Sequence, residues 1–161
     1  MKGRASAGHL AKNSAGFINM SYIQETPTIK YYLAGPMTGY PEFNIPAFRA
    51  AKLNLEAQGF EIELPYDIDN TAENWTWGQY LAEDIKLICD QCQGIILLPE
   101  WERSRGAKLE IACGLMQSLK FPNFEFRFYS NGKASDPVHR DRIAIAWYWN
   151  WETYSKEVQA A

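Results

Sequence analysis

The feature that most constrains this chain is a run of apolar residues, 94–98, that ends at a proline and leads through a polar turn into a helical pattern. Such a run is typical of a short strand that is buried on both faces of a parallel sheet. Gly106 opens the helical pattern, which we predict over 107–119, and Glu110 stands in its first turn. This order places Glu110 at the carboxyl end of the sheet, where open α/β folds bind their ligands.

Strand-like and helix-like segments alternate along the rest of the chain. The predicted strands cover 28–34, 60–64, 94–98 and 124–129, and the predicted helices lie between Asn44 and Gly59, over 78–91 and over 107–119. This alternation implies right-handed βαβ units, and 161 residues suffice for one domain. We therefore expect an α/β fold over residues 27–161, a single-domain three-layer sandwich with a doubly wound parallel sheet, Rossmann- or flavodoxin-like.

Local signals mark the first helix and the end of the last strand. Asn44 is the expected cap of the first helix. The predicted apolar face of that helix consists of Phe48, Ala51 and Leu55. The sequence Ser-Asn-Gly at 130–132 is expected to turn the chain after the last strand.

The two ends of the chain follow no single pattern. Residues 1–26 are rich in Ala, Gly, Ser and Asn, and we interpret them as a disordered leader or a cloning remnant. In the segment 142–161, the first half alternates like a strand and the second half favours a helix, so its secondary structure stays open. Its tryptophans, Trp147, Trp149 and Trp151, form an aromatic segment that we expect at an oligomer interface.

Composition narrows the classes of partner. The chain is 47% hydrophobic and 22% charged, with a formal net charge of −3, which argues against a nucleic-acid polymer as the main partner. No run approaches the ~18 apolar residues of a membrane span, and no secretory signal is evident at the first residues. We therefore expect a cytoplasmic protein with no membrane partner.

The cysteines fit a reducing compartment, since there are three of them, Cys89, Cys92 and Cys113, without the spacing of a disulfide framework. The two-residue spacing between Cys89 and Cys92 leaves a metal-binding or redox pair open. No second pair and no nearby His supports that alternative. We expect sulfurs that pack in the interior and no metal site.

If the predicted topology holds, three side chains meet at one edge of the sheet. Tyr32 lies near the end of the first strand, Asp84 on the second helix and Glu110 after the central strand. The turn at Gly35 and the turn 104–106 share this edge, and backbone N–H groups at such turns bind anions. Each signal has an ordinary alternative. In these alternatives, Glu110 would only compensate the helix dipole, Asp84 would be a solvated helix residue, and Tyr32 would be a core residue.

Three ordered blocks resemble the nucleoside 2-deoxyribosyltransferase superfamily. They are Tyr-Leu-Ala-Gly-Pro-Met-Thr-Gly at 32–39, Leu-Ala-Glu-Asp-Ile at 81–85 and the segment 97–110. The most specific part is Trp-x-x-Ser-x-Gly-Ala-x-x-Glu at 101–110, and the resemblance covers roughly residues 28–120. The chain is most similar to a phage and bacterial branch that resembles the 2′-deoxynucleoside 5′-monophosphate N-glycosidases.

The resemblance implies a catalytic trio and a set of substrate-binding residues. Tyr32, Asp84 and Glu110 match the catalytic Tyr, Asp and Glu of the family. Ser104 matches a serine that contacts the substrate phosphate, and the cationic Arg105 beside it favours a nucleotide substrate. The substrate-binding residues are expected to be Gly35, Pro36, Met37, Trp101, Ser104, Arg105 and Gly106.

Other residues bear on the substrate and on the completeness of the expected site. Glu100 and Glu102 place negative charge near the expected phosphate site, which opposes a nucleotide substrate. Trp75, Trp77 and Trp101 are candidates for stacking on the base, with ordinary core positions as the alternative. In the family, C-terminal residues of a neighbouring subunit often complete the site, which is an alternative role for the aromatic segment.

The resulting expectation is an N-glycosidase that cleaves the base–sugar bond of a 2′-deoxynucleoside 5′-monophosphate, with Glu110 acting at C1′. We expect no metal or organic cofactor, a small nucleotide or nucleoside as the partner, and a homodimer or higher homo-oligomer. One alternative is a nucleoside 2-deoxyribosyltransferase that exchanges bases. Another is a catalytically silent protein that binds or sequesters nucleotides.

Overall fold

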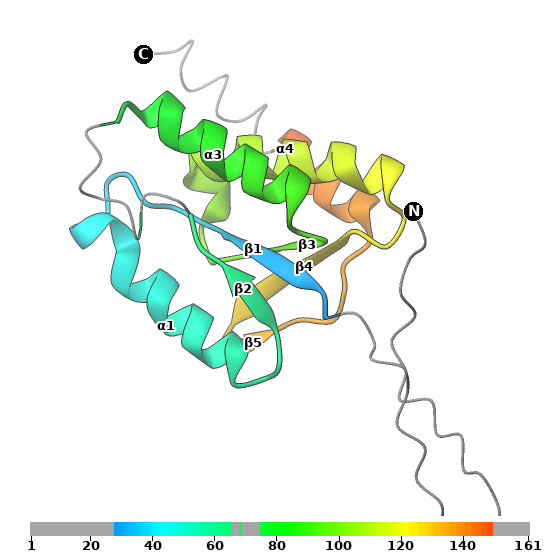
Figure 1. The fold of residues 1–161 in the computed structure, drawn as a ribbon, viewed down its shortest axis with the longest axis horizontal. Helices are drawn as coiled ribbons and strands as arrows, with labels where there is room; N and C mark the ends of the chain where they lie inside the picture. The colour runs from blue at the N-terminus through cyan, green and yellow to red at the C-terminus, as the bar shows by residue number, and fades with distance from the viewer. Residues whose placement is uncertain (1–27, 66–67, 69–74, 150–161) are drawn as a thin grey trace, which may run out of the picture.

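Five strands form one sheet, and their order positions the candidate site. The computed structural model describes residues 28–65, 68 and 75–149, so the predictions for residues 1–26 and for Trp151 lie outside it. The strands lie in the order β2-β1-β3-β4-β5 (Figure 1). Their bounds are Lys30–Ala34 for β1, Glu61–Glu63 for β2, Gly94–Leu97 for β3, Glu125–Ser130 for β4 and Lys133–Ala134 for β5.

The sheet confirms the predicted α/β fold with one amendment. The first four strands run parallel in the order that is typical of a flavodoxin-like sheet. β5 pairs antiparallel with β4, because Asn131 and Gly132 both adopt positive φ and close a two-residue hairpin. The expected turn at 130–132 is confirmed, and the sheet is mixed rather than wholly parallel.

Helices cover both faces of this sheet. α1 (Ile45–Glu56) lies on one face, and α3 (Trp77–Asp90) and α4 (Arg105–Lys120) lie on the other (Figure 1). A further helix over 140–149 packs on the same side as α4. The predicted apolar face of α1 is confirmed, since its three residues are buried against the strands: Phe48, Ala51 and Leu55.

α1 begins directly after Asn44 as predicted, but its cap and the start of α4 differ from the sequence prediction. Asn44 precedes α1 with a left-handed backbone (φ 61°) instead of the extended one typical of a cap, and its side chain makes no capping hydrogen bond. Its Nδ2 donates to the carbonyl oxygen of Pro36 at 2.8 Å. α4 begins at Arg105, two residues earlier than predicted. Ser104 sets this start by accepting a hydrogen bond at Oγ from the Ala107 N–H at 3.1 Å. Glu110 therefore lies in the second turn of α4 rather than the first.

The C-terminal segment is helical as far as the structure describes it, from 140 to 149. Ile143 is fully buried in the core layer that contains α4. Trp147, one turn later, donates from Nε1 to the carbonyl oxygen of Lys108 at 2.7 Å, whereas Trp149 is exposed. Buried and exposed residues of this segment thus lie on two sides of a helix. The strand-like pattern in the first half of 142–161 does not form a strand in residues 142–149.

The expected interior position is confirmed for Cys92 and is wrong for Cys89, which is exposed. Cys92 is buried in the core, and Cys89 of α3 lies with its Sγ 3.3 Å from the Sγ of Cys113 on α4. Cys89 therefore contacts Cys113 rather than Cys92. Among the described residues, no group of three or more His, Cys, Asp or Glu side chains is arranged to hold a metal ion.

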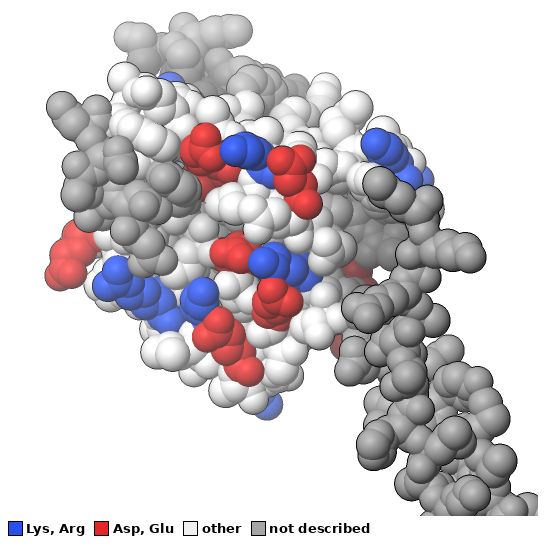
Figure 2. All heavy atoms as spheres, viewed as in Figure 1, with Lys and Arg blue, Asp and Glu red and all other residues white. Residues whose placement is uncertain are grey.

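Charged side chains are interspersed over the surface. On the face drawn in Figure 2, acidic and basic groups alternate instead of gathering into a field of one sign. Ion pairs within single helices contribute to this pattern, as in Lys52–Glu56 at 3.6 Å and Lys86–Glu83 at 3.7 Å. In the part of the chain that the structure describes, no helix is long and apolar enough to cross a membrane.

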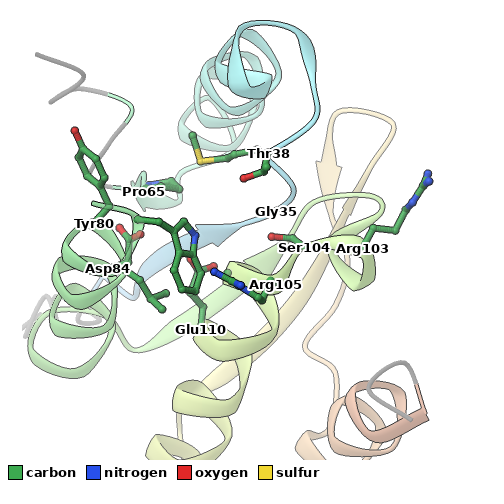
Figure 3. A pocket seen from close by; sticks show the side chains of 13 residues that line it. Gly35, Thr38, Pro65, Tyr80, Asp84, Arg103, Ser104, Arg105 and Glu110 are labelled. Atoms are coloured by element: carbon green, nitrogen blue, oxygen red, sulfur yellow. The ribbon is translucent and has the colours of Figure 1, made fainter. Parts of the chain in front are cut away.

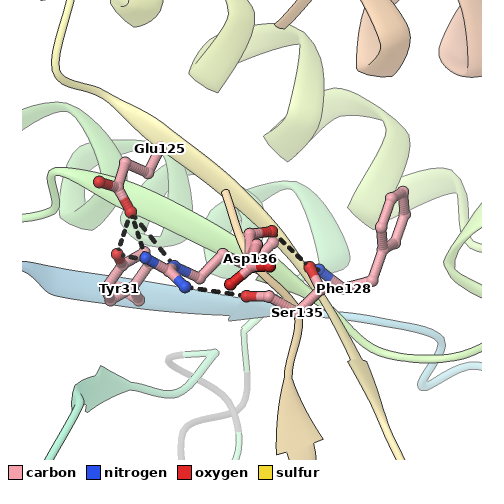
Figure 4. A network of polar contacts seen from close by, with 6 residues as sticks. Tyr31, Glu125, Phe128, Ser135 and Asp136 are labelled. Carbon is pink, nitrogen blue, oxygen red and sulfur yellow. Dashed lines mark hydrogen bonds and ion pairs between the residues drawn. The ribbon is translucent and has the colours of Figure 1, made fainter. Parts of the chain in front are cut away.

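Tyr31 on β1 reaches across β3 to β4. The register aligns Tyr31 with Gly94 and Gly94 with Glu125, and Tyr31 Oη donates to Glu125 Oε2 at 2.5 Å (Figure 4). Arg127 donates to the Tyr31 oxygen at 3.0 Å and to Glu125 at 2.8 Å. Burial, together with the hydrogen bond to Glu125, raises the pKa of Tyr31 to about 12. The hydroxyl therefore stays protonated at neutral pH and remains a donor in this network.

Gly94→Ala is expected to lower the free energy of unfolding by about 1–3 kcal/mol through overpacking. The added Cβ would lie 2.6 Å from the Tyr31 ring and 2.7 Å from the carbonyl oxygen of Glu125. Urea unfolding followed by circular dichroism measures the change. Gly78→Ala on α3 is the matched control, because nothing lies within 4 Å of its added Cβ. Equal destabilisation of the two variants would contradict this account.

Candidate functional site

The candidate site lies where the winding of the sheet reverses. β1 continues into α1 and β2 on one side, whereas β3 continues into α4 and β4 on the other. The connections diverge at such a point and leave a crevice at the carboxyl ends of the strands. A cavity of about 560 Å³ occupies this place (Figure 3). Its lining residues are Gly35, Met37, Thr38, Pro65, Trp77, Tyr80, Leu81, Asp84, Arg103, Ser104, Arg105, Gly106 and Glu110.

Glu110 is a buried carboxyl group that the first strand holds in place. It is 5% exposed and reaches the cavity from the second turn of α4. Tyr32 of β1, which is fully buried, donates from Oη to Glu110 Oε1 at 3.1 Å. The structure thus brings the two predicted residues together, and Tyr32 acts on the cavity by orienting Glu110.

Asp84 enters the cavity from α3. A capping box sets the start of this helix, in which Thr76 Oγ1 accepts from the Gln79 N–H at 3.4 Å and Gln79 Oε1 accepts from the Thr76 N–H at 2.9 Å. From that start, Trp77, Leu81 and Asp84 follow at helical spacing and all line the cavity. Asp84 is 6% exposed, so the alternative of a solvated helix residue is wrong.

The turn 104–106 presents hydrogen-bond donors to the cavity. Arg105 and Gly106 are the first two residues of α4, and N–H groups at these positions have no partner within a helix. The Ser104 hydroxyl accepts from Ala107 and has its own hydrogen to donate. The positive end of the helix dipole lies at the same place. This combination suits an anionic group such as a phosphate.

The remaining predicted residues fall into two groups. Gly35 and Met37 line the cavity, and a Cβ on Gly35 would lie 2.8 Å from the Cβ of Leu98, so the packing of the strand ends requires glycine there. Pro36 is buried outside the lining. Trp101 is 6% exposed and belongs to the hydrophobic core. This geometry does not support the expected substrate contacts of Pro36 and Trp101.

A second set of contacts joins the loop after β1 to the loop after β3, beside the cavity. Glu100 precedes the short helix η2 (Trp101–Arg103), and its carboxylate accepts from Tyr40 Oη at 2.7 Å and from Arg103 Nη1 at 3.0 Å. The Tyr40 hydrogen bond, together with Arg103, lowers the pKa of Glu100, and the same hydrogen bond raises the pKa of Tyr40. Arg103 points away from Asp84 and Glu110 (Figure 3). The charge of Glu100 is therefore compensated at the rim, outside the cavity lining.

Sequence reasoning missed several lining residues, namely Thr38, Pro65, Tyr80, Leu81 and Arg103. Tyr80 and Leu81 lie one helical turn before Asp84, so the spacing on α3 could have found them. Pro65 follows β2, which borders β1, so it becomes predictable once the strand order is known. Trp77, a candidate for stacking, lines the cavity with one face of its ring beneath Arg105.

The cavity lies where the winding of the sheet reverses, and it contains two buried carboxyl groups. These features define the class of the protein: a flavodoxin-like α/β protein with a candidate small-ligand site at the carboxyl edge of its sheet. Within this class, the chain belongs to the family described as a domain of unknown function, DUF4406, which matches residues 29–121. The matched part extends from β1 to the end of α4 and contains every lining residue of the cavity. A comparison with curated proteins finds no match.

Tyr32→Phe is expected to lower the free energy of unfolding by about 1.5–3 kcal/mol, because it removes a donor to a buried carboxyl group. Chemical denaturation at neutral pH measures the change. Tyr148→Phe, at an exposed position of the 140–149 helix, is the matched control and should shift stability by no more than about 0.5 kcal/mol. A Tyr32→Phe variant as stable as the wild type would show that this hydrogen bond contributes nothing.

Proposed function

We propose that this protein is an N-glycosidase that cleaves the base–sugar bond of a 2′-deoxynucleoside 5′-monophosphate. The observation that carries the proposal is a buried carboxyl group, Glu110, held by Tyr32 in a cavity that contains a second buried carboxyl group, Asp84. Two carboxyl groups in one cavity are the usual means of cleaving a glycosidic bond. The resemblance of the lining segments to the nucleoside 2-deoxyribosyltransferase superfamily supports the same assignment.

Glu110 is the nucleophile of the first step. Breaking the bond between C1′ and the base nitrogen develops positive charge on the sugar, which a carboxylate stabilises. A Glu110 oxygen attacks C1′ as that bond breaks, and a glycosyl ester forms. The electron pair of the broken bond leaves with the base, whose ring nitrogen takes a proton from Asp84. Tyr32 keeps the attacking carboxylate in one orientation through its hydrogen bond.

Water completes the reaction. A water oxygen attacks C1′, the ester bond to Glu110 breaks, and the carboxylate is regenerated. Asp84, ionised after the first step, accepts the proton of the water. The net reaction converts one nucleotide and one water into a free base and 2-deoxyribose 5-phosphate. A second base in place of water would give deoxyribosyl transfer, the alternative activity.

The turn 104–106 supports a phosphorylated substrate. The Ser104 hydroxyl, the first N–H groups of α4 and the Arg105 guanidinium border one end of the cavity. Glu100, whose charge would oppose a phosphate, is paired with Arg103 at 3.0 Å and does not line the cavity. In this arrangement the 5′-phosphate binds at the start of α4, and the base lies toward Asp84.

Glu110→Gln is expected to reduce base release by a factor on the order of a thousand or more, because an amide is not a nucleophile for C1′. Mass spectrometry of free bases, after incubation with deoxy- and ribonucleosides and their monophosphates, measures the effect. Glu102→Gln makes the same chemical change at a glutamate outside the cavity lining, so it is the matched control and should retain activity. Undiminished release by Glu110→Gln would refute the assignment. Faster turnover on adding a second base would indicate transfer.

Asp84→Asn is expected to slow release of natural bases by about 10²–10⁴-fold, the usual contribution of a general acid. A 4-nitrophenyl 2-deoxyribofuranoside 5-phosphate needs no proton on its leaving group, so the Asp84→Asn variant should release 4-nitrophenol and form the glycosyl ester with little loss of kcat/KM. Comparing kcat/KM for the two substrates measures the difference, because kcat/KM reports the steps up to release of the leaving group and not the later attack of water. Glu83→Gln is the control, because it alters the carboxylate next to Asp84 in the sequence, which is paired with Lys86 at 3.7 Å. Equal losses on both substrates would exclude Asp84 as the acid.

A further inference from the structure

One contact at the cavity mouth joins the starts of two helices. The guanidinium carbon of Arg105 lies 3.8 Å from the centre of the Trp77 ring. Trp77 is the first residue of α3 and Arg105 is the first residue of α4, and both line the cavity. Each helix start is set by its own cap, at Thr76 and at Ser104. The stacked pair is therefore held by the backbone on both sides.

Stacking determines what Arg105 can offer to a ligand. A guanidinium that lies on an aromatic ring uses its flat face, and its N–H donors remain in the plane of the group, at its edge. An arginine side chain without such a support spreads over many rotamers, and ordering it opposes binding. The Trp77 ring thus confines Arg105 to a restricted set of orientations before a ligand arrives.

The charges around the cavity also indicate Arg105 as the group that binds an anion. Asp84 and Glu110 give one part of the lining an acidic character, so an anionic group must bind elsewhere. Of the two arginines in the lining, Arg103 pairs with Glu100 at 3.0 Å and points away (Figure 3). Arg105 lies over Trp77, next to the Ser104 hydroxyl and the first N–H groups of α4.

We infer that Trp77 is a positioning residue, which orients the edge of the Arg105 guanidinium toward the 5′-phosphate of the substrate and so favours nucleotides over nucleosides. This inference rests on the proposed function, because it assigns the phosphate to the turn 104–106. It gives the tryptophan a role other than stacking on the base, since Arg105 covers one face of its ring.

Titration calorimetry with 2-deoxyribose 5-phosphate tests the inference without any chemical step. Trp77→Leu should weaken binding about two- to fivefold, the range expected from losing a cation–π contact at a partly exposed site. Trp77→Phe should recover most of the affinity, because it restores an aromatic face. Trp77 is 44% exposed, so these variants should keep the thermal stability of the wild type. Arg105→Ala should weaken binding at least about tenfold.

The double variant separates positioning from direct contact. In the Arg105→Ala background, Trp77→Leu should have no further effect on the affinity, because the tryptophan acts only through the arginine. An equal loss in both backgrounds would mean that Trp77 touches the ligand itself and would overturn the inference. Unchanged affinity of the single Trp77→Leu variant would overturn it as well.

The outcomes also separate this inference from the proposed function. A wild-type protein that binds the sugar phosphate and shows the expected coupling, yet releases no base from any nucleotide, would retain the role of Trp77 and refute the glycosidase. Base release that depends on Glu110, without coupling between Trp77 and Arg105, would do the reverse. A wild-type protein that binds no sugar phosphate would refute both the role of Trp77 and the phosphate site.

Discussion

The pairing of β1 with β3 is the contact on which the site depends. The two strands run parallel with Ala34 opposite Leu97, and the Leu98 N–H donates to the carbonyl oxygen of Ala34 at 2.8 Å. Both strands therefore end at the same level, and the loops that follow begin side by side. Because α1 and α4 leave toward opposite faces, the loops separate and a cavity opens between them. Gly35 permits this approach, since a side chain there would meet Leu98.

The neighbouring residues Tyr31 and Tyr32 serve opposite faces of β1. Side chains alternate along a strand, so one tyrosine lies toward α1 and the other toward α4. Tyr31 crosses Gly94 to reach Glu125, which ties β1 to β4 over the strand between them. Tyr32 donates to Glu110 from the same strand. The network that ties β1 to β4 therefore involves the residue next to the donor that orients the carboxyl group.

The cavity combines buried carboxyl groups with a cationic rim. Removing Asp84 and Glu110 from water costs free energy unless hydrogen bonds compensate, and Tyr32 supplies one such bond to Glu110. The opposite electrostatic character lies at the start of α4, where Arg105 adds to the helix dipole. A molecule with an anionic end and a carbon that becomes positive during reaction matches this arrangement. That match is the physical basis of the nucleotide substrate proposed above.

Apolar spacing along the sequence predicted the four parallel strands and the three long helices, because it records which residues must leave water. It placed the start of α4 two residues late, since the cap at Ser104 depends on a hydrogen bond that spacing does not encode. By itself, the sequence determined the order of the elements and the residue types at the strand ends. Only the tertiary structure decided that Trp101 lies in the core, that Asp84 is buried at the cavity, and that Arg105 stacks on Trp77. These outcomes depend on contacts between elements that are distant in the chain, which no local pattern specifies.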